Sequence, residues 1–358
     1  MWHSTHTETE NLLGENIRRE PGESISQTYT TSDLLSPLFF LSKRRFLSYE
    51  ESAFFGIMSQ NYSTLLITGG SGFLGWNLAR VAAAKSYDVS FTYGQHPLAI
   101  PHCREYHLDL HDRQQLEDVI EAIAPDAIIH TAALANADVC EKRRSAAYDI
   151  NVAATERIAQ CAEERNCRLL YISTDLVFDG RQGNYAEQDR PNPLNYYAES
   201  KLLGEKAVKA VSSNYLIMRT ALMYGQGNGV HGSFLEWMHR NLQSKQPVSL
   251  FTDQYRTPLF VHDAAHALLE IMESSAGNDT FHLGGAQRLN RCEFGEIFAR
   301  IFGYDQALLR PVTMQDVPSN AARGADCSLN STKIQQELSF QLSDVAAGLR
   351  QLYQSGVS

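Results

Sequence analysis

Short apolar runs alternate with longer segments of helical period over most of the chain. Buried parallel strands are short and continuously apolar, whereas amphipathic helices repeat their apolar positions every three to four residues. Strands are therefore predicted at 65–68, 88–93, 127–130, 168–173 and 216–219, and helices at 72–84, 112–123, within 138–165 and at 197–211. Strands joined through helices need crossover connections and form a parallel sheet. The sequence predicts an α/β protein with a Rossmann-type, doubly wound parallel sheet.

The alternation of strands and helices does not extend over the residues before and after this predicted sheet domain. Residues 1–57 are rich in Ser, Thr, Glu and Asn and show no sustained period, so a flexible N-terminal extension is expected, with Met58 as the working start. A partner-binding arm is the alternative for this segment. The sheet domain is expected over 58–224, and a smaller C-terminal lobe mainly over 225–358, with 257–275 returning to the sheet domain.

Composition narrows the class of protein. The 358 residues are 43% hydrophobic and 20% charged, which is typical of a soluble globular protein. A net charge of -10 argues against binding to nucleic acid or to an anionic membrane surface. The apolar stretch at 34–41 is far shorter than the ~20 residues of a membrane span. The six cysteines form no Cys-x-x-Cys pair, so neither a metal site nor a disulfide framework is predicted, and a cytoplasmic location is expected.

The first predicted strand runs into the glycine-rich stretch TGGSGFLG, residues 68–75, which opens the first helix. Gly69 permits a tight turn, Gly72 lets a pyrophosphate approach the backbone, and Gly75 allows close packing of the helix. The N–H groups and the dipole at a helix N-terminus attract an anion. A purely structural turn is the alternative, but the strand before and the helix after favour a dinucleotide site. The candidate cofactor-binding residues are Gly69, Ser71, Gly72, Phe73, Leu74 and Gly75.

The end of the second strand bears on which dinucleotide binds. A carboxylate there holds the ribose 2′-hydroxyl of NAD and repels the 2′-phosphate of NADP. This strand ends in Tyr93-Gly94-Gln95-His96, and Asp88 lies at its opposite end. Because no acidic residue occupies the position, NADP(H) is the expected cofactor, with NAD(H) tolerated.

A tyrosine and a lysine four positions apart, Tyr197 and Lys201 in YAESK, share one face of a predicted helix. A nearby ammonium stabilises a phenolate, so Lys201 is expected to lower the pKa of Tyr197 and make it a usable general acid. Such pairs also occur on ordinary solvated helices. The upstream segment YISTDLVFDG favours the catalytic interpretation, because Thr174 and Asp175 fall at the carboxyl end of a strand, where open α/β sheets bind their ligands.

These stretches together resemble the extended short-chain dehydrogenase/reductase superfamily and, within it, the dTDP-4-dehydrorhamnose reductase family. The motifs that carry the resemblance are TGGSGFLG, STDLVFDG, PNPLNYYAESKLLGE, RTALMYG, FTDQYRTPLFVHDAA, FHLGG and ADCSLNSTKI. The resemblance covers the chain from about residue 65 to the C-terminus. It implies hydride transfer from NADPH to a ketone of a nucleotide-linked 4-keto-6-deoxy sugar, with a substrate-binding C-terminal lobe, and it is compatible with a homodimer.

The resemblance also implies roles for particular residues. Thr174 would hydrogen-bond the carbonyl oxygen of the substrate, Tyr197 would donate the proton, and Lys201 would tune the tyrosine and bind the nicotinamide ribose. His130 is interpreted as a buried polar residue that satisfies backbone groups. The further residues expected at the cofactor are Asp109, Leu110, Ala132 and Ala133, and those expected at the substrate are Asp175 and, near its diphosphate, Arg256.

The sequence departs from the family where the sugar should bind. Leu176 replaces a usual tyrosine, and Ala221-Leu222 replaces a usual Ser-Trp, which leaves the identity of the sugar open. Two other functions are compatible with the same scaffold. One is an NAD-dependent sugar-nucleotide epimerase or dehydratase, and the other is a non-catalytic NADP-binding regulatory subunit resembling that of methionine adenosyltransferase.

Overall fold

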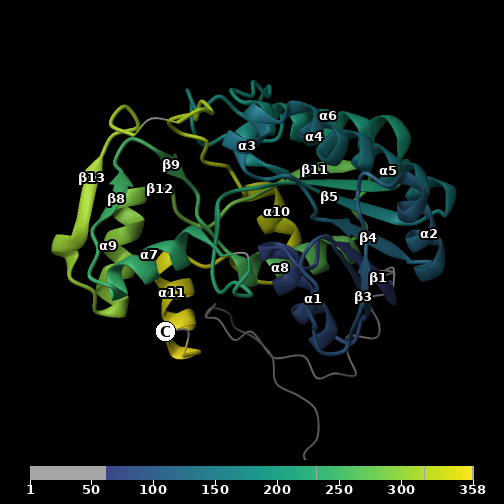
Figure 1. Cartoon of the computed structure of the whole chain (residues 1–358), viewed down its shortest axis with the longest axis horizontal. Coiled ribbons are helices and arrows are strands. Elements are labelled where there is room, and N and C mark those ends of the chain that lie inside the picture. The colour runs from purple at the N-terminus through teal and green to yellow at the C-terminus, as the bar shows by residue number, and fades with distance from the viewer. Residues whose placement is uncertain (1–61, 231, 318, 357–358) are drawn as a thin grey trace, which may run out of the picture. The chain divides into compact units, whose positions relative to one another are not determined.

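A seven-stranded parallel sheet forms the centre of the computed structural model, which describes residues 62–230, 232–317 and 319–356 (Figure 1). Its strand order is β11-β6-β5-β4-β1-β2-β3, so the order reverses between β1 and β4. The strands are β1 Thr64–Thr68, β2 Asp88–Tyr93, β3 Cys103–His107, β4 Ala127–His130, β5 Arg168–Thr174, β6 Tyr215–Thr220 and β11 Asp279–Leu283. This reversal is the topological switch point of a doubly wound sheet, and it confirms the predicted Rossmann-type fold.

Helices cover both faces of the sheet, which explains why its central strands are apolar throughout. Leu65 and Ile67 of β1 pack into the core beneath one pair of helices, whereas Leu66 packs into the core on the opposite face. The first face carries α1 Phe73–Ala84 and α8 Val261–Glu273, and the second carries α2 Arg113–Ile123, α5 Ala154–Glu164 and α6 Tyr196–Val211.

Two strands of the sheet were not predicted, and both have a physical reason. The edge strand β3 reads Cys-Arg-Glu-Tyr-His and is largely exposed, so it lacks the apolar run that marks a buried strand. Strand β11 pairs with β6 from more than fifty residues further along the chain. The five predicted strands are all present, with ends that differ from the prediction by at most one residue.

The helix expected within 138–165 is divided into shorter pieces. They are α3 Ala137–Lys142, α4 Arg144–Tyr148, a π-helical turn Asp149–Ala153, and α5. Asn151 in the π turn is fully buried, and its side chain donates to Leu134 O at 3.1 Å and to Ser200 Oγ at 2.9 Å. A buried amide that bonds to α6 and to the strand-end loop holds the chain in the wider turn, as π bulges often do near functional sites.

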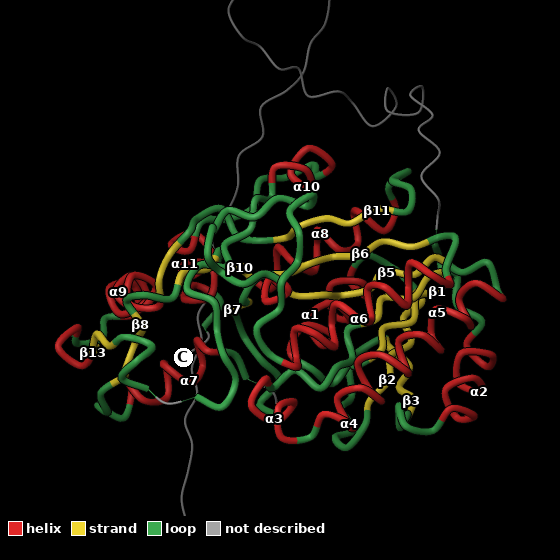
Figure 2. The backbone as a smooth tube through the Cα atoms, turned by 90° about the horizontal axis from the view of Figure 1, so that it is seen from above, coloured by secondary structure: helices red, strands yellow, loops and turns green. Residues whose placement is uncertain are grey.

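The C-terminal lobe lies at one end of the folded unit, and strands β1 to β3 lie at the other (Figures 1 and 2). A separate core holds it together, in which Phe294 and Phe298 of α9 pack with Leu349 of α11. Its elements are α7 Phe234–Gln243, β8 Val248–Phe251, β9 Tyr255–Arg256, β12 Leu289–Asn290, α9 Arg291–Phe302, β13 Leu309–Val312 and α11 Val345–Gln354. Strands β8 and β13 pair in parallel, and β9 and β12 pair antiparallel.

The segment between the parts of the lobe returns to the sheet. Helix α8 lies within the expected segment 257–275, and the chain then continues into β11 and, after the lobe elements, into α10 Thr332–Glu337 beside β11. The short pair β7 Met223–Tyr224 and β10 Leu259–Phe260 joins the two regions. The expected extension over 1–57 and its apolar stretch at 34–41 lie outside the described residues. Across the part that is described, every helix is too short or too polar to cross a membrane.

Candidate active site

One large cavity opens at the carboxyl ends of the parallel strands and has a volume of about 1320 Å³. Its lining comes from the sheet domain and from the lobe. Every residue that the sequence predicted for the site contributes to this lining: Gly69, Ser71, Gly72, Phe73, Leu74, Gly75, Asp109, Leu110, Ala132, Ala133, Thr174, Asp175, Tyr197, Lys201 and Arg256. The structure thus brings together segments almost 190 residues apart in the chain, since Gly69 and Arg256 face the same cavity.

The glycine turn needs its glycines for reasons of backbone geometry. Gly69 has φ +71°, and a Cβ on it would lie 2.8 Å from Ala132 Cα. A Cβ on Gly75 would lie 2.3 Å from Gly69 O, so this glycine lets α1 pack against the turn. Gly72 is the N-cap of α1 and provides no side-chain cap for the first N–H groups of the helix. An uncapped helix N-terminus at the cavity wall suits an anionic group.

No carboxylate stands at the end of β2. Asp88, at the opposite end of this strand, forms an ion pair with Arg104 at 2.5 Å. The cavity wall here contains three histidines that sequence reasoning did not single out, His96, His107 and His111. Asp109 lies beside them after β3, where its Oδ1 accepts from His111 N at 3.0 Å. The wall around the end of β2 is therefore neutral to basic at residues 92–97, as expected for a site that accepts a 2′-phosphate.

His130 ends β4 behind the loop that holds Ala132. Its Nδ1 lies 2.6 Å from Thr68 Oγ1, and its Nε2 lies 3.0 Å from Thr155 Oγ1. The expected partners were backbone groups, but the actual partners are two threonine hydroxyls. Burial, together with the nearby charge of Lys201, lowers the pKa of His130 to about 3, so the ring is neutral and structural.

Thr174 and Asp175 lie where β5 ends. Thr174 Oγ1 donates to Asp175 Oδ1 at 3.0 Å and accepts from Leu176 N at 3.2 Å. Asp175 is buried, and Arg256 Nε lies 3.4 Å from its Oδ2. Burial raises the pKa of Asp175, while the charge of Arg256 opposes the rise. Thr174 and Asp175 thus line the cavity at the point where the sheet domain meets the lobe, with the threonine hydroxyl bonded to the carboxylate.

Tyr197 and Lys201 lie one turn apart on α6, which begins where the side chain of Asn195 accepts from Ala198 N at 2.9 Å. Burial and the charge of Asp175 raise the pKa of Tyr197, and its interaction with Thr174 opposes the rise. The expectation that Lys201 lowers this pKa is wrong for this structure. The physical reason is that the Lys201 ammonium lies over the Tyr171 ring, 4.1 Å from its centroid. Tyr197 is thus held in its protonated form at neutral pH.

Three arginines gather at the lobe side of the cavity, and two of them, Arg291 and Arg323, were missed by sequence reasoning. Arg291 is the first residue of α9, and burial together with the charge of Arg256 lowers its pKa to about 9. Arg323 donates to Asp138 Oδ2 at 2.9 Å. No local pattern around Arg291 or Arg323 distinguishes them from other surface cations. Arg256 is buried, and Arg291 and Arg323 are half-buried. Crowded guanidinium groups with restricted access to water favour an anion with several acceptor oxygens.

The part of the cavity near Thr174 is apolar on one side. Leu176, Ala221, Leu222 and Met223 line it, and these include the positions where the sequence departs from the rhamnose-pathway pattern. Side chains of this kind offer no hydrogen-bond partners to a hydroxyl-rich sugar.

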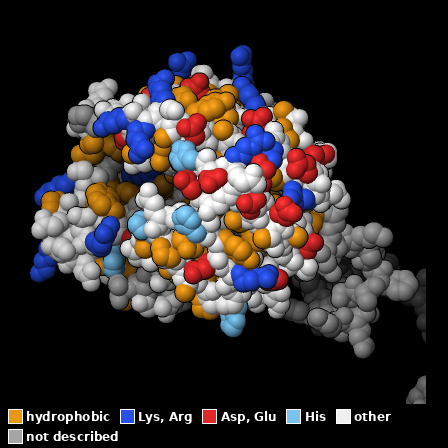
Figure 3. Space-filling view, turned by 45° about the vertical axis from the view of Figure 1, so that its right-hand side comes forward, with side chains coloured by type: hydrophobic (Ala, Val, Ile, Leu, Met, Phe, Trp, Pro, Cys, Tyr) orange, Lys and Arg blue, Asp and Glu red, His pale blue; other side chains and the backbone are white. Residues whose placement is uncertain are grey.

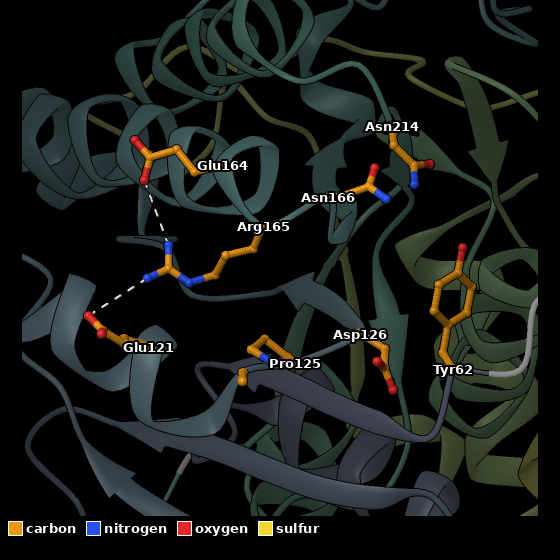
Figure 4. A pocket seen from close by; sticks show the side chains of 9 residues that line it. Tyr62, Glu121, Pro125, Asp126, Glu164, Arg165, Asn166 and Asn214 are labelled. Carbon is orange, nitrogen blue, oxygen red and sulfur yellow. Dashed lines mark ion pairs between the residues drawn. The ribbon is translucent and has the colours of Figure 1, made fainter.

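A second cavity, of about 940 Å³, lies at the amino ends of the strands (Figure 4). Arg165 lies between Glu121 and Glu164, at 3.9 and 3.7 Å. Asp126 accepts from the backbone N–H of Ser63 and of Thr64, at 3.0 and 2.9 Å. The charged groups of this cavity are thus engaged with one another and with the chain. The molecular surface in Figure 3 shows acidic side chains among basic ones rather than a continuous basic face.

Comparison with known proteins agrees with the fold. A family model described as the RmlD substrate binding domain matches residues 63–357. The dTDP-4-dehydrorhamnose reductase of Aggregatibacter actinomycetemcomitans is 31% identical over 301 residues, which cover 80% of this chain and 97% of that protein. Methionine adenosyltransferase 2 subunit beta of Rattus norvegicus is 32% identical over 246 residues, covering 66% of this chain and 73% of that protein.

Among solved structures, the dTDP-4-dehydrorhamnose reductase of Bacillus anthracis in complex with NADP superposes with a TM-score of 0.73. The alignment is 26% identical and covers 82% of this chain and 100% of that chain. These matches confirm the resemblance that the motifs indicated. The chain belongs to the RmlD substrate binding domain family, in the dTDP-4-dehydrorhamnose reductase-like branch of the short-chain dehydrogenase/reductases.

Proposed function

We propose that the protein is an NADPH-dependent oxidoreductase that reduces the ketone of a nucleotide-linked 4-keto-6-deoxy sugar. The observation that carries the proposal is the single cavity lined by both the glycine turn and the set Thr174, Tyr197 and Lys201. A cofactor held by the turn would extend along the carboxyl ends of the strands toward these three side chains. The family membership and the NADP named with the Bacillus anthracis reductase support this assignment.

The chain's residues fit a dinucleotide. The start of α1 has no side-chain cap, and glycine at positions 69 and 75 lets the turn pack tightly against Ala132 and α1, which leaves the first N–H groups of the helix available to a pyrophosphate. The absence of a carboxylate from residues 92–97 allows the 2′-phosphate of NADP(H), and NAD(H) would also be tolerated. When bound, the reduced cofactor supplies the hydride to the ketone carbon.

The catalytic residues would then manage the oxygen of the reacting ketone. Tyr197, kept protonated by its surroundings, would give its proton to the oxygen as negative charge develops there. Thr174 would turn its hydroxyl from Asp175 toward the same oxygen and orient it. Lys201 would bind the nicotinamide ribose from the floor of the cavity.

The substrate would span the sheet domain and the lobe. Arg256, Arg291 and Arg323 would hold its diphosphate, because guanidinium groups pair with phosphate oxygens through two parallel hydrogen bonds. Leu176 and Leu222 would contact the apolar 6-deoxy carbon. A ring with few free hydroxyls suits this lining better than a fully hydroxylated one.

A turnover screen tests this proposal. NADPH oxidation is measured against a panel of nucleotide-linked 4-keto sugars, for the natural protein and for Tyr197→Phe. The variant should bind NADPH as the natural protein does and lose roughly a hundredfold or more in kcat, the usual contribution of general acid catalysis. Full activity in Tyr197→Phe would overturn the assignment of the acid. Turnover of sugars without net NADPH consumption would instead indicate an epimerase or dehydratase.

A second candidate is a non-catalytic, NADP-binding regulatory subunit. The observation that favours it is the 32% identity to methionine adenosyltransferase 2 subunit beta, beside 31% to a reductase. The two functions separate cleanly. A regulatory subunit would turn over no keto sugar and would change the activity of a partner enzyme that it binds, whereas a reductase needs no partner for turnover.

A further inference from the structure

Lys201 is buried in the structure without a carboxylate partner. Its side chain belongs to a residue only 3% exposed, and its ammonium lies 4.1 Å from the centroid of the Tyr171 ring. Within the described part of the chain, no ion pair or hydrogen bond joins Lys201 Nζ to an acidic side chain. The face of an aromatic ring attracts a cation, more strongly where water is excluded. The ring of Tyr171 is therefore the main favourable contact of this ammonium.

Glu205, the carboxylate whose charge acts on Lys201, is hydrogen-bonded to other side chains. Glu205 follows Lys201 by one turn on α6, and both its oxygens accept from Arg219, at 2.9 Å from Nε and 2.8 Å from Nη2. Ser173 Oγ donates to the same carboxylate at 2.6 Å. The side chains of Arg219 and Glu205 are only 5% and 2% exposed. Arg219 thus neutralises a buried charge that would otherwise draw Lys201 down the helix, away from Tyr197.

The position of the ring is fixed by the helix that carries Lys201. Tyr171 is fully buried on β5, and its hydroxyl donates to Lys201 O at 3.3 Å. A Cβ at Gly204 would lie 2.3 Å from Tyr171 Oη, so glycine at this position is what allows α6 to lie so close to the ring. The turn of α6 that carries Lys201 and Gly204 therefore also fixes where the Tyr171 ring lies relative to the ammonium.

We propose that Tyr171 is the positioning residue for Lys201, holding its ammonium at the cavity floor through the ring face, while Arg219 occupies Glu205 and leaves the lysine free. This rests on the proposed function only in giving Lys201 a role at the nicotinamide ribose; the contact itself is a property of the chain. Tyr171 acts through Lys201 and contacts neither substrate nor cofactor in this scheme.

The charged and titratable groups that surround Lys201, or that act on it through Glu205, come from four elements. They are Tyr197 and Glu205 on α6, Tyr171 on β5, Arg219 on β6 and His130 on β4. Burial lowers the pKa of Lys201 to about 7, and the charge of Glu205 opposes this. Since a ring face stabilises only the protonated amine, loss of the ring should lower the pKa of Lys201 further.

The test is a direct titration of Lys201. The full-length protein is labelled with ¹³C at lysine Cε, and the Lys201 signal is assigned by its loss in Lys201→Met and followed by NMR against pH. Tyr171→Phe keeps the ring and should leave the pKa unchanged, whereas Tyr171→Leu should lower it by about 0.5 to 1 pH unit. Tyr215→Leu, which removes a tyrosine from the same core on β6, is the matched control and should leave Lys201 unaffected.

A second substitution at position 171 provides the same test if Tyr171→Leu fails to fold. Pentafluorophenylalanine placed at position 171 keeps the size and shape of the ring but removes the negative potential of its face, and it should lower the pKa as the leucine does. An unchanged or raised pKa in both the leucine and the fluorinated variants would overturn the proposal. So would an equal drop in Tyr171→Phe. The titration needs no cofactor or substrate. Its result therefore holds even if the reductase assay fails, and a failed titration does not contradict the reductase proposal.

Discussion

Buried histidines should make the stability of this protein sensitive to acid. His282 is fully buried, and its Nδ1 lies 2.9 Å from Tyr185 O. Burial and the charge of Arg219 lower its pKa to about 4 from an ordinary value of 6.5. The folded state therefore binds fewer protons than the unfolded state between these values. His282 contributes stability that is fully present above pH 6.5 and is lost as pH falls toward 4, by about 3 kcal/mol at most.

The variant His282→Gln tests this, because glutamine can donate to the same carbonyl and does not titrate. Urea unfolding midpoints measured at pH 7 and pH 4.5 should fall less for the variant than for the natural protein. A fall of equal size would show that His282 is not responsible. The variant keeps His130, whose pKa is lowered to about 3, so part of the acid dependence of stability should remain in it.

At the scale of single residues, the sequence predicted those side chains whose motif is local. The glycine turn and the Tyr197 and Lys201 pair owe their placement to backbone geometry within a few residues. The direction of the pKa shift of Tyr197 was predicted wrongly, since it depends on the burial of the phenol and on the charge of Asp175, which no spacing reveals. Arg291 was missed because the sequence cannot show which cation faces a cavity formed by distant segments.

At the scale of elements, the contact between α1 and the glycine turn sets how the cradle forms. Gly75→Ala should be destabilising even though alanine favours helices by about 1 kcal/mol. The new Cβ would meet Gly69 O at 2.3 Å, and a backbone atom in a tight turn cannot move aside without shifting α1. We expect a net loss of about 1 to 3 kcal/mol in the free energy of unfolding, and weaker NADPH binding.

A matched control is available at Gly277, where an added Cβ would meet nothing within 4 Å. Gly277→Ala should change the free energy of unfolding by no more than about 0.5 kcal/mol and should bind NADPH normally. Equal behaviour of the two variants in urea unfolding and in fluorescence titration with NADPH would contradict the role given to Gly75.

Elements with a strong apolar pattern were predicted well, and those shaped by tertiary contacts were not. Strand β2 has the predicted bounds, because its buried run is bounded by exposed residues and can be recognised from the local sequence. The π turn at Asp149–Ala153 depends on the hydrogen bonds of Asn151 to Leu134 and Ser200, which come from other elements. Strand β3 was missed because an edge strand need not be apolar.

At the scale of the whole molecule, the cavity exists only where the sheet domain and the lobe meet. The protein carries a net charge of -10, yet three arginines face this cavity with Asp175 as the nearby buried carboxylate. Arg291 lies at the N-terminus of α9, where the helix dipole carries partial positive charge. The positive guanidinium of Arg291 is therefore repelled by the helix dipole. A phosphate group that enters the cavity would relieve this repulsion.

This arrangement predicts that Arg291→Met weakens the binding of a nucleoside diphosphate by roughly tenfold or more, the usual size of a charged hydrogen bond. NADPH binding should change little, because the dinucleotide would lie along the glycine turn on the sheet side. Arg300→Met, an exposed arginine on the same helix, is the matched control and should behave as the natural protein. Calorimetric titration with the diphosphate and with NADPH separates the two effects. If Arg291→Met binds the diphosphate with unchanged affinity, the diphosphate does not bind at the lobe side of the cavity. If the variant loses affinity for both the diphosphate and NADPH, the substitution has shifted the lobe.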